Sequence, residues 1–263
     1  MISFSIVTVT YNAEKVLQRT LDSVLKQTYK GVEHLIVDGA SKDQTLTMVE
    51  QYKQQSEASD NGHRVIIQSE PDQGIYDAMN KGLRLATGNY VVFLNAGDTL
   101  YAADTLDIVA RCASQHPLPA VVYGDTAITD DDGRFLHLRR HRPPSQLSWR
   151  SFRQGMLVCH QAFYVRADIA RHTPYDLQYR HSADVDWCIR VMKAADRLRL
   201  PLVNSHAVLC NFAEGGDTTQ HHGDSLCERF KVMASHYGYV STLLLHGWFV
   251  VRAVYRRLSS SLT

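Results

Sequence analysis

Polar residues follow the apolar runs in the first hundred residues of this chain, and their chemistry suits ligand binding. Asp38 comes directly after such a run and precedes Gly39, which lets a ligand approach the backbone closely. A carboxylate at this place can accept hydrogen bonds from a ribose or from the edge of a base. Asp38 can equally form a turn that caps the following helix, as aspartate often does. The residues alone leave both roles open.

The segment Asn95-Ala96-Gly97-Asp98 ends another apolar run and supplies one carboxylate. An aspartate in such a place can hold a divalent cation that bridges two phosphates, because Mg²⁺ keeps most of its waters and needs few protein ligands. Gly-Asp after a strand is also a common turn. The segment therefore indicates a metal site only in combination with other signals.

Several well-known phosphate and catalytic motifs are missing. The first apolar run is not followed by G-x-G-x-x-G, and the chain contains neither G-x-x-x-x-G-K-[ST] nor G-x-S-x-G. A dinucleotide fold is therefore disfavoured, and a P-loop is excluded. A phosphate-bearing ligand needs another means of charge neutralisation, which the 95–98 segment offers.

The elements that must position these residues alternate between strand and helix. Such an order predicts right-handed βαβ crossovers and a mainly parallel sheet, with ligands outside the carboxyl ends of the strands. Asn12 is the expected N-cap of the first helix, and residues 54–62 are expected to be a loop. The predicted strands are 5–10, 34–37, 65–68 and 90–94, and the predicted helices are 13–27, one around 46–52, and 75–86.

After residue 100 the pattern becomes less regular. We expect a basic loop over 139–153 and two closing helices. The other expected elements are strands at 120–124, 162–165 and 200–209, a hairpin over 126–138, and a helix over 184–195. The expected organisation is a nucleotide-sugar-binding half (1–100), an acceptor-binding and catalytic-base half of the same domain (101–222), and a C-terminal helical appendage (223–263).

Composition narrows the class of protein. The 263 residues include 28 Lys and Arg against 27 Asp and Glu, so a broadly basic nucleic-acid binder is disfavoured. The five cysteines are scattered and form no C-x-x-C pair, which favours reduced thiols over disulfides or a zinc site. We read no signal peptide and no apolar stretch long enough to span a bilayer. We therefore expect a cytoplasmic protein and leave open peripheral contact with the inner face of the cell membrane.

Four blocks together resemble the family-2 glycosyltransferases with the GT-A fold. They occur in the family's order, and the third is similar to the branch that builds exopolysaccharide, colanic-acid-type and O-antigen repeats. The resemblance covers about residues 3 to 220. The blocks are S-I-V-T-V-T-Y-N (5–12), V-D-G-A-S-K-D-Q-T (37–45), S-E-P-D-Q-G-I-Y-D-A-M-N-K-G (69–82) and Y-V-V-F-L-N-A-G-D (90–98).

The resemblance implies a nucleotide-sugar donor with UDP-sugars as the expected class, Mg²⁺ or Mn²⁺, an aspartate base and inversion at the anomeric carbon. Asp98 then stands at the metal motif. Asn95 departs from the usual acidic residue, so metal affinity without donor should be weak, and metal independence stays open. The implied donor-binding residues are Thr10, Tyr11, Asn12, Asp38, Asp72, Gly74, Asn80, Lys81, Asn95, Gly215 and Gly216.

The implied catalytic base is Asp184, which matches the family's aspartate before a helix. A carboxylate suits the role because it is ionised at neutral pH and can accept the proton of an acceptor hydroxyl. Asp184 can alternatively be an N-cap, and His181 is a second candidate base. Asp186 is expected in the first turn of the helix, where the dipole favours it. His160 and Gln161 are candidates for acceptor binding.

The last helix is expected to be amphipathic and basic, with Arg252, Arg256 and Arg257 beside an apolar face. Such a helix can lie on an anionic membrane or pack on the core. Together these features predict transfer of a sugar to a hydroxyl of a lipid-linked polysaccharide repeat-unit intermediate. The alternative is a non-catalytic nucleotide-binding subunit of a polysaccharide assembly complex, which Asn95 favours.

Overall fold

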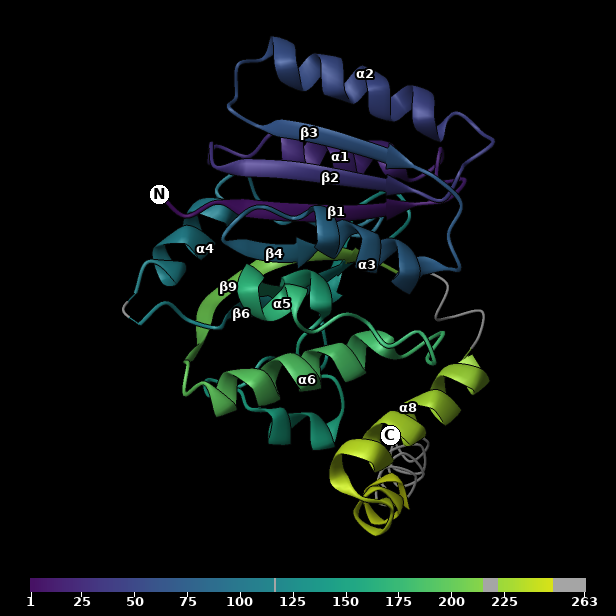
Figure 1. The fold of residues 1–263 in the computed structure, drawn as a ribbon, viewed down its shortest axis with the longest axis vertical. Coiled ribbons are helices and arrows are strands. Elements are labelled where there is room, and N and C mark those ends of the chain that lie inside the picture. The colour runs from purple at the N-terminus through teal and green to yellow at the C-terminus, as the bar shows by residue number, and fades with distance from the viewer. Residues whose placement is uncertain (116, 215–221, 248–263) are drawn as a thin grey trace, which may run out of the picture.

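A single nine-stranded sheet forms the centre of the molecule, with helices packed on both of its faces (Figure 1). The computed structural model describes residues 1–115, 117–214 and 222–247. The strand order is β3-β2-β1-β4-β8-β6-β9-β5, and β7 pairs with β6. The strands are β1 (Phe4–Thr10), β2 (Val32–Asp38), β3 (Arg64–Ser69), β4 (Tyr90–Phe93), β5 (Thr99–Leu100), β6 (Val121–Thr129), β7 (Phe135–Leu138), β8 (Phe163–Arg166) and β9 (Leu202–Ala213).

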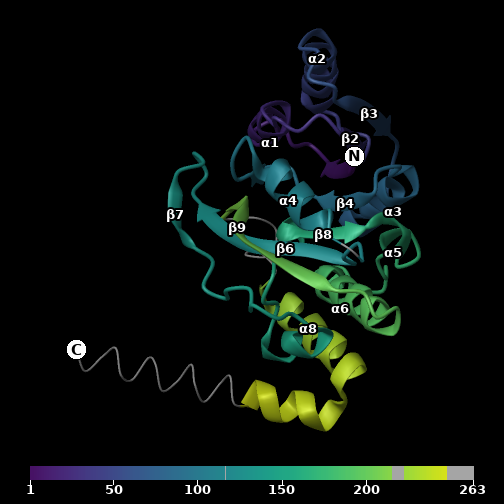
Figure 2. The ribbon, with the colours of Figure 1, turned by 90° about the vertical axis from the view of Figure 1, so that its left-hand side faces the viewer.

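The first four strands form the parallel part of the sheet, because helical crossovers connect them. Every residue of β1 and β2 is buried, so both faces of these strands are covered. Figure 2 shows α1 and α3 on opposite sides of them. The helices are α1 (Leu17–Leu25), α2 (Thr45–Ala58), α3 (Ile75–Leu85), α4 (Thr105–Ala113), α5 (Ala167–Arg171), α6 (Ala183–Arg197) and α8 (His222–Tyr237), with 3₁₀ turns η1 (Trp149–Gln154) and η2 (His160–Ala162).

The alternating order of strands and helices is confirmed, but three local predictions are wrong. The first helix begins at Leu17, because Asn12 adopts φ 48° and its side chain accepts a hydrogen bond from Lys42 N instead of capping the helix. The expected loop at 54–62 is helical as far as Ala58, where α2 buries Ser56. The sequence reading also missed α4 and β5.

The second half of the chain adds strands of mixed direction. The hairpin is confirmed as β6 and β7, which pair antiparallel with a register shift. Strand β8 lies antiparallel between β4 and β6 and so joins the parallel part to the rest of the sheet. Strand β9 runs parallel to β6.

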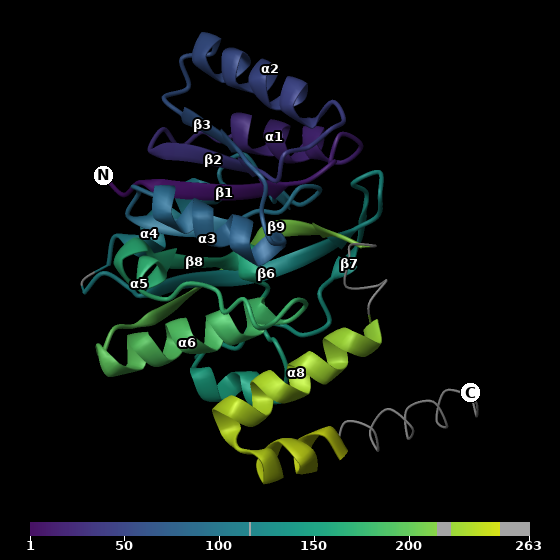
Figure 3. The ribbon, with the colours of Figure 1, turned by 45° about the vertical axis from the view of Figure 1, so that its right-hand side comes forward.

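Helix α8 packs against α6 on the side of the molecule away from α2 (Figure 3). Val232 and Met233 of α8 are buried, so this helix contributes to the core. Residues 239–247 continue the chain as a further helical segment. In the part of the chain that the structure describes, no helix combines the length and apolar character needed to cross a bilayer.

Candidate active site

The carboxyl ends of β1, β2 and β3 meet around one buried carboxylate. Asp38 is fully buried and lies between Thr10, Ser41 and Ser69; we call these four residues the Asp38 cluster. Its Oδ1 accepts hydrogen bonds from Thr10 Oγ1 (3.0 Å) and Ser41 Oγ (2.5 Å). Its Oδ2 accepts from Ser41 N (2.9 Å) and Ser69 Oγ (2.7 Å). Asp38 thus forms a turn with Ser41 but does not cap α2, which begins at Thr45. Ligand binding by Asp38 stays a prediction.

The residues after β1 lie over this cluster. Tyr11 is 64% exposed, so its ring is accessible to a ligand. Asn12 N donates to Ser41 Oγ at 2.8 Å, which ties the end of β1 to the loop after β2. A Cβ added to Gly39 would lie 2.5 Å from Asp72 Oδ2 and 3.3 Å from the Tyr11 ring. Only glycine therefore allows β2, Tyr11 and Asp72 to approach so closely.

The third motif block, residues 69–82, forms one wall of the site. Several of its side chains bond to other parts of the protein and are not available to a ligand. Gly74 begins α3 with φ 115°, a conformation that favours glycine, and its N–H donates to Asp72 Oδ1. Lys81 Nζ donates to Pro71 O at 2.7 Å. Asn80 bonds the backbone N–H and carbonyl of Tyr175. In this structure Asn80 and Lys81 support the wall and do not reach into the site.

Four side chains gather beyond the end of β4, and we call them the central cluster: Tyr76, Asn95, His160 and Asp184. His160 Nδ1 lies 3.4 Å from Asp184 Oδ2, and His160 Nε2 lies 3.4 Å from Asn95 Nδ2. Tyr76 Oη lies 3.4 Å from Asp184 Oδ1. This pattern fits the tautomer with the proton on Nδ1, which donates to Asp184. Asn95 Oδ1 is buried and has no hydrogen-bond partner among the described residues.

Asp98 lies beside the central cluster and is almost fully buried. Its Oδ2 accepts from Gln161 Nε2 (2.7 Å), and its Oδ1 accepts from Ala213 N (3.1 Å). Burial raises the pKa of Asp98 to about 6 against the lowering effect of these bonds. The consecutive residues His160 and Gln161 therefore connect the expected base to the expected metal ligand. Both are buried, so their acceptor-binding role stays a prediction.

Asp184 is the second residue of α6, and its side chain is 20% exposed. Burial raises the pKa of Asp184, but the hydrogen bond from His160 and the charge of Arg229 outweigh it and hold the pKa below its usual value. Asp184 is therefore ionised at neutral pH, as a base must be. The N-cap position belongs to Ser182, which makes no side-chain capping bond.

Glu228 of α8 holds the segment before Asp184. Its carboxylate accepts three consecutive backbone N–H groups, from Arg180 (2.9 Å), His181 (2.7 Å) and Ser182 (3.1 Å). These bonds fix the entry into α6 and, with it, the direction of Asp184. The sequence carried no signal for this contact, because it joins residues 46 to 48 positions apart.

Asp186 occupies the first turn of α6, as expected, but its role is structural. It is buried and accepts hydrogen bonds from Arg190 Nε (2.6 Å) and His236 Nε2 (2.7 Å). Burial raises its pKa, and these two partners outweigh that effect and lower it. Asp186 therefore joins α6 to α8. Neither of these two hydrogen bonds involves a residue of the central cluster.

The oxygen atoms at the end of β4 fit a divalent cation that takes most of its ligands from a diphosphate. Asn95 Oδ1 is an unpartnered buried acceptor, and each oxygen of Asp98 accepts one hydrogen bond and so keeps a lone pair. Among the described residues, no group of three His, Cys, Asp or Glu side chains gathers to hold a metal. Two protein oxygens suit Mg²⁺ or Mn²⁺ bound together with phosphates and water.

The sequence-predicted residues therefore fall into four groups. One surrounds Asp38 and includes Thr10, Tyr11, Asn12 and Asp72. A second is the central cluster with Asp98. Gly74, Asn80 and Lys81 belong to the wall of the site, and Gln161 belongs with Asp98. Gly215 and Gly216 lie outside the described residues. Ser41, Ser69 and Tyr76 were missed as site residues although they lie inside the recognised blocks.

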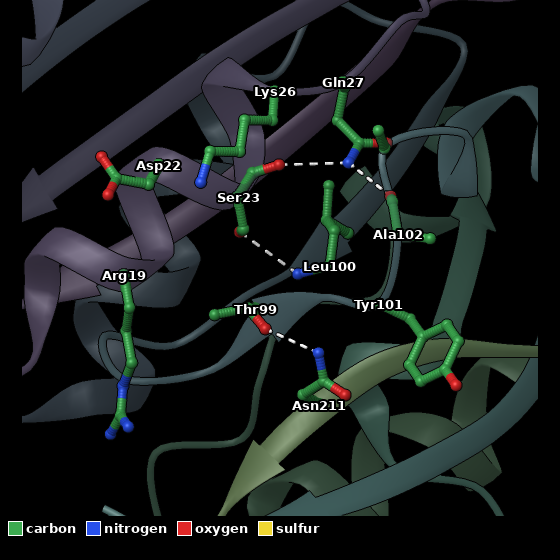
Figure 4. A pocket seen from close by; sticks show the side chains of 11 residues that line it. Arg19, Asp22, Ser23, Lys26, Gln27, Thr99, Leu100, Tyr101, Ala102 and Asn211 are labelled. Atoms are coloured by element: carbon green, nitrogen blue, oxygen red, sulfur yellow. Dashed lines mark hydrogen bonds between the residues drawn. The ribbon is translucent and has the colours of Figure 1, made fainter. Parts of the chain in front are cut away.

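A cavity of about 330 Å³ lies elsewhere, between α1 and β5 (Figure 4). Its polar groups already bond one another: Asn211 Nδ2 donates to Thr99 Oγ1, and Gln27 Nε2 donates to Ala102 O. None of the strand-end carboxylates lines it. The chemistry of the central cluster, and not cavity size, therefore marks the candidate site.

Comparisons with known proteins bear on the family and the fold of this chain. The family model described as "Glycosyl transferase family 2" matches residues 5–172 of this chain. The PGL/p-HBAD biosynthesis glycosyltransferase of Mycobacterium bovis is 40% identical over 188 residues, covering 71% of this chain and 68% of that protein. The amylovoran biosynthesis glycosyltransferase AmsB of Erwinia amylovora is 30% identical over 237 residues, covering 86% and 74%. The mannosyltransferase PcManGT of Pyrobaculum calidifontis, solved with GDP-Man and Mn²⁺, is similar with a TM-score of 0.62 at 15% identity, covering 99% of this chain and 80% of that one.

Proposed function

This chain belongs to glycosyl transferase family 2, and we propose that it moves a sugar from a nucleotide-sugar to a hydroxyl of a lipid-linked saccharide, with inversion at the anomeric carbon. Glycosyltransferase activity in polysaccharide or glycolipid biosynthesis follows from the family and its relatives. The fold is of the GT-A type. Beyond the family and the fold, we propose the class of donor, the class of acceptor and the inversion of the anomeric carbon.

The Asp38 cluster is the proposed nucleoside end of the donor site. The exposed ring of Tyr11 offers a surface on which a base can stack, and the lack of a side chain at Gly39 lets Asp72 approach this ring. Each oxygen of Asp38 already accepts two hydrogen bonds, so its proposed role is to orient its partner hydroxyls toward a ribose or base. UDP-sugars remain the expected class. GDP-sugars belong in the same test, because the similar PcManGT was solved with GDP-Man.

The diphosphate end of the donor is proposed to lie at Asn95 and Asp98. A bound Mg²⁺ or Mn²⁺ there would neutralise the leaving diphosphate. Asp98 supplies the negative charge and Asn95 the unpartnered amide oxygen. The Mn²⁺ in the PcManGT complex supports this assignment.

Asp184 is the proposed base. It is ionised and partly exposed, and it is oriented by His160 and Tyr76. The acceptor hydroxyl gives its proton to Asp184 while its oxygen forms a bond to the anomeric carbon and the bond to the nucleotide diphosphate breaks. A direct displacement of this kind inverts the anomeric carbon. The observation that carries the proposal is the connection of Asp184 to Asn95 through His160, next to Asp98.

The proposal is tested by measuring nucleotide release from UDP-glucose, UDP-N-acetylglucosamine and GDP-mannose with Mg²⁺ or Mn²⁺. Each donor is incubated with and without a polyprenyl-diphosphate-linked saccharide. We expect one donor to release its nucleotide only when the acceptor is present. Donor binding without release, for every donor and acceptor tried, would instead support the non-catalytic assembly subunit.

A further inference from the structure

A basic and aromatic pocket lies between η1 and α8, away from the central cluster. It has a volume of about 190 Å³ and is lined by Trp149, Arg150, Arg153, His236 and Tyr237. The Trp149 and Tyr237 rings stack with centroids 5.7 Å apart and an interplanar angle of 4°. The guanidinium of Arg150 lies 4.5 Å from the centre of the Trp149 ring. We call this site the Trp149 pocket.

Two arginines supply positive charge to the Trp149 pocket. Arg150 and Arg153 are exposed, and within the described residues neither forms an ion pair with a carboxylate. Both ring nitrogens of His236 form hydrogen bonds, Nε2 with Asp186 and Nδ1 with Lys193. The aromatic rings hold the Arg150 side chain in place, so less freedom is lost when a guanidinium binds an anion. Two such groups suit a phosphate, whose oxygens they can bind in pairs.

An exposed apolar face adjoins the Trp149 pocket. Tyr239, Val240, Leu243 and Leu244 are 64%, 71%, 54% and 71% exposed, and their spacing places them as i, i+4 pairs on a helical segment. Arg153 Nη2 donates to Ser241 Oγ of the same segment at 2.5 Å. The cationic pocket and the apolar face are therefore fastened together.

The sequence of this region selects one kind of partner. After Glu228 the sequence contains no Asp or Glu and five Lys or Arg, whereas the whole chain carries a net charge of only +1. Three of the five, Arg252, Arg256 and Arg257, lie outside the described residues. Positive charge beside exposed aromatic and aliphatic side chains matches the boundary between anionic headgroups and acyl chains. An acidic protein would satisfy the arginines but would not need the apolar face.

We propose that the Trp149 pocket binds the phosphate of an anionic lipid headgroup while Tyr239, Val240, Leu243 and Leu244 enter the bilayer surface. This proposal rests on the proposed function in one respect: a lipid-linked acceptor is the reason for the protein to bind a membrane. Binding to a bilayer itself needs no sugar transfer. Asp184 on the first turn of α6 is then presented toward a membrane-borne substrate, because α8 contacts both η1 and α6.

The experiment measures binding of the full chain to phosphatidylglycerol vesicles and to phosphatidylcholine vesicles. The test variants are Arg150→Gln alone and Arg150→Gln with Arg153→Gln. The matched control removes two exposed arginines elsewhere, Arg64→Gln with Arg111→Gln. We expect binding only to the anionic vesicles. The single variant should weaken it roughly fivefold and the pair roughly 30-fold, with little change in the control.

Equal weakening by the pair and by the control would show that net charge alone attracts the protein, and would overturn the proposal. Unchanged binding of Arg150→Gln would also overturn it, and this variant breaks no hydrogen bond in the described structure. Replacement of Leu243 and Leu244 by Asn should likewise release the protein from the vesicles. Nucleotide release with a detergent-solubilised acceptor should be retained in all these variants, which separates this test from that of the proposed function.

Discussion

The two polar clusters of the site differ in how tightly their side chains are joined. In the Asp38 cluster the four hydrogen bonds of the carboxylate measure 2.5 to 3.0 Å, and the acceptor is fully buried. In the central cluster, three contacts each measure 3.4 Å, and Asn95 Oδ1 has no partner in the described part of the chain.

This difference indicates that one cluster serves to bind the donor and the other serves the reaction. A fully bonded carboxylate shapes its surroundings and does not change when a ligand binds. Loose contacts around an ionised carboxylate leave it free to exchange partners with an incoming hydroxyl, and catalytic bonds are often long before substrates arrive. We therefore assign anchoring to the Asp38 cluster and reaction to the central cluster.

The largest expected effect comes from Asp184→Asn, which keeps the shape of the side chain but cannot accept a proton at neutral pH. Turnover should fall on the order of 10²- to 10⁴-fold. Donor affinity should change little, because the base faces the acceptor. Steady-state kinetics and calorimetry on one preparation check both expectations.

Asp186→Asn is the matched control two residues away. It weakens a buried contact between α6 and α8, and loss of one partner of such a pair costs roughly 3 kcal/mol. It should lower the melting temperature while the folded enzyme keeps its turnover. An inactive Asp186→Asn beside an active Asp184→Asn would reverse the two roles.

A second comparison concerns donor affinity and its dependence on metal. Asp38→Ala removes the buried acceptor shared by three hydroxyls and should weaken donor binding on the order of 10- to 100-fold, with or without Mg²⁺. Asp98→Asn should remove only the metal-dependent part. Calorimetric titrations in Mg²⁺ and in EDTA distinguish the two. The same loss in both variants under both conditions would contradict the separation of roles.

The pH dependence should reveal which carboxylate titrates first. Burial raises the pKa of Asp98 to about 6, whereas the pKa of Asp184 lies below its usual value. As the pH falls through 6, Asp98 gains a proton and loses its charge, so kcat/KM should fall about tenfold by pH 5 while Asp184 stays ionised. Asp98→Asn should abolish this inflection. An inflection that persists in that variant belongs to another group.

The smallest expected effect is that of Glu228→Gln. The amide has a single acceptor oxygen, so it cannot hold all three N–H groups before α6. We expect kcat to fall a few-fold, up to about tenfold, with an unchanged donor KM, because only the direction of Asp184 changes. Glu50→Gln, on the exposed face of α2, is the control. Equal changes in kcat and in donor KM would indicate a general structural defect.

The sequence predicted the parallel half of the fold well, because β1 and β2 are rich in apolar and β-branched residues and end in polar turns. It failed where tertiary contacts override local pattern. Asn12 has the residue type of an N-cap, but the loop after β2 takes its side chain. Likewise, the bonds of Glu228 join distant segments and leave no periodic signal. The recognised blocks pointed to Asp98, and the family resemblance beyond them pointed to Asp184. Their connection through His160 and Gln161 emerged only from the structure.

The anomeric configuration of the product tests the central claim most directly. The central cluster contains one ionised and partly exposed carboxylate, Asp184, while Asp98 beside it is almost fully buried and bonded to Gln161 and Ala213. A single base without a nucleophile permits one displacement only. We predict that an α-linked nucleotide-sugar gives a β-linked product, identified by the coupling constant of its anomeric proton in NMR. An α-linked product formed directly by the enzyme would contradict the account.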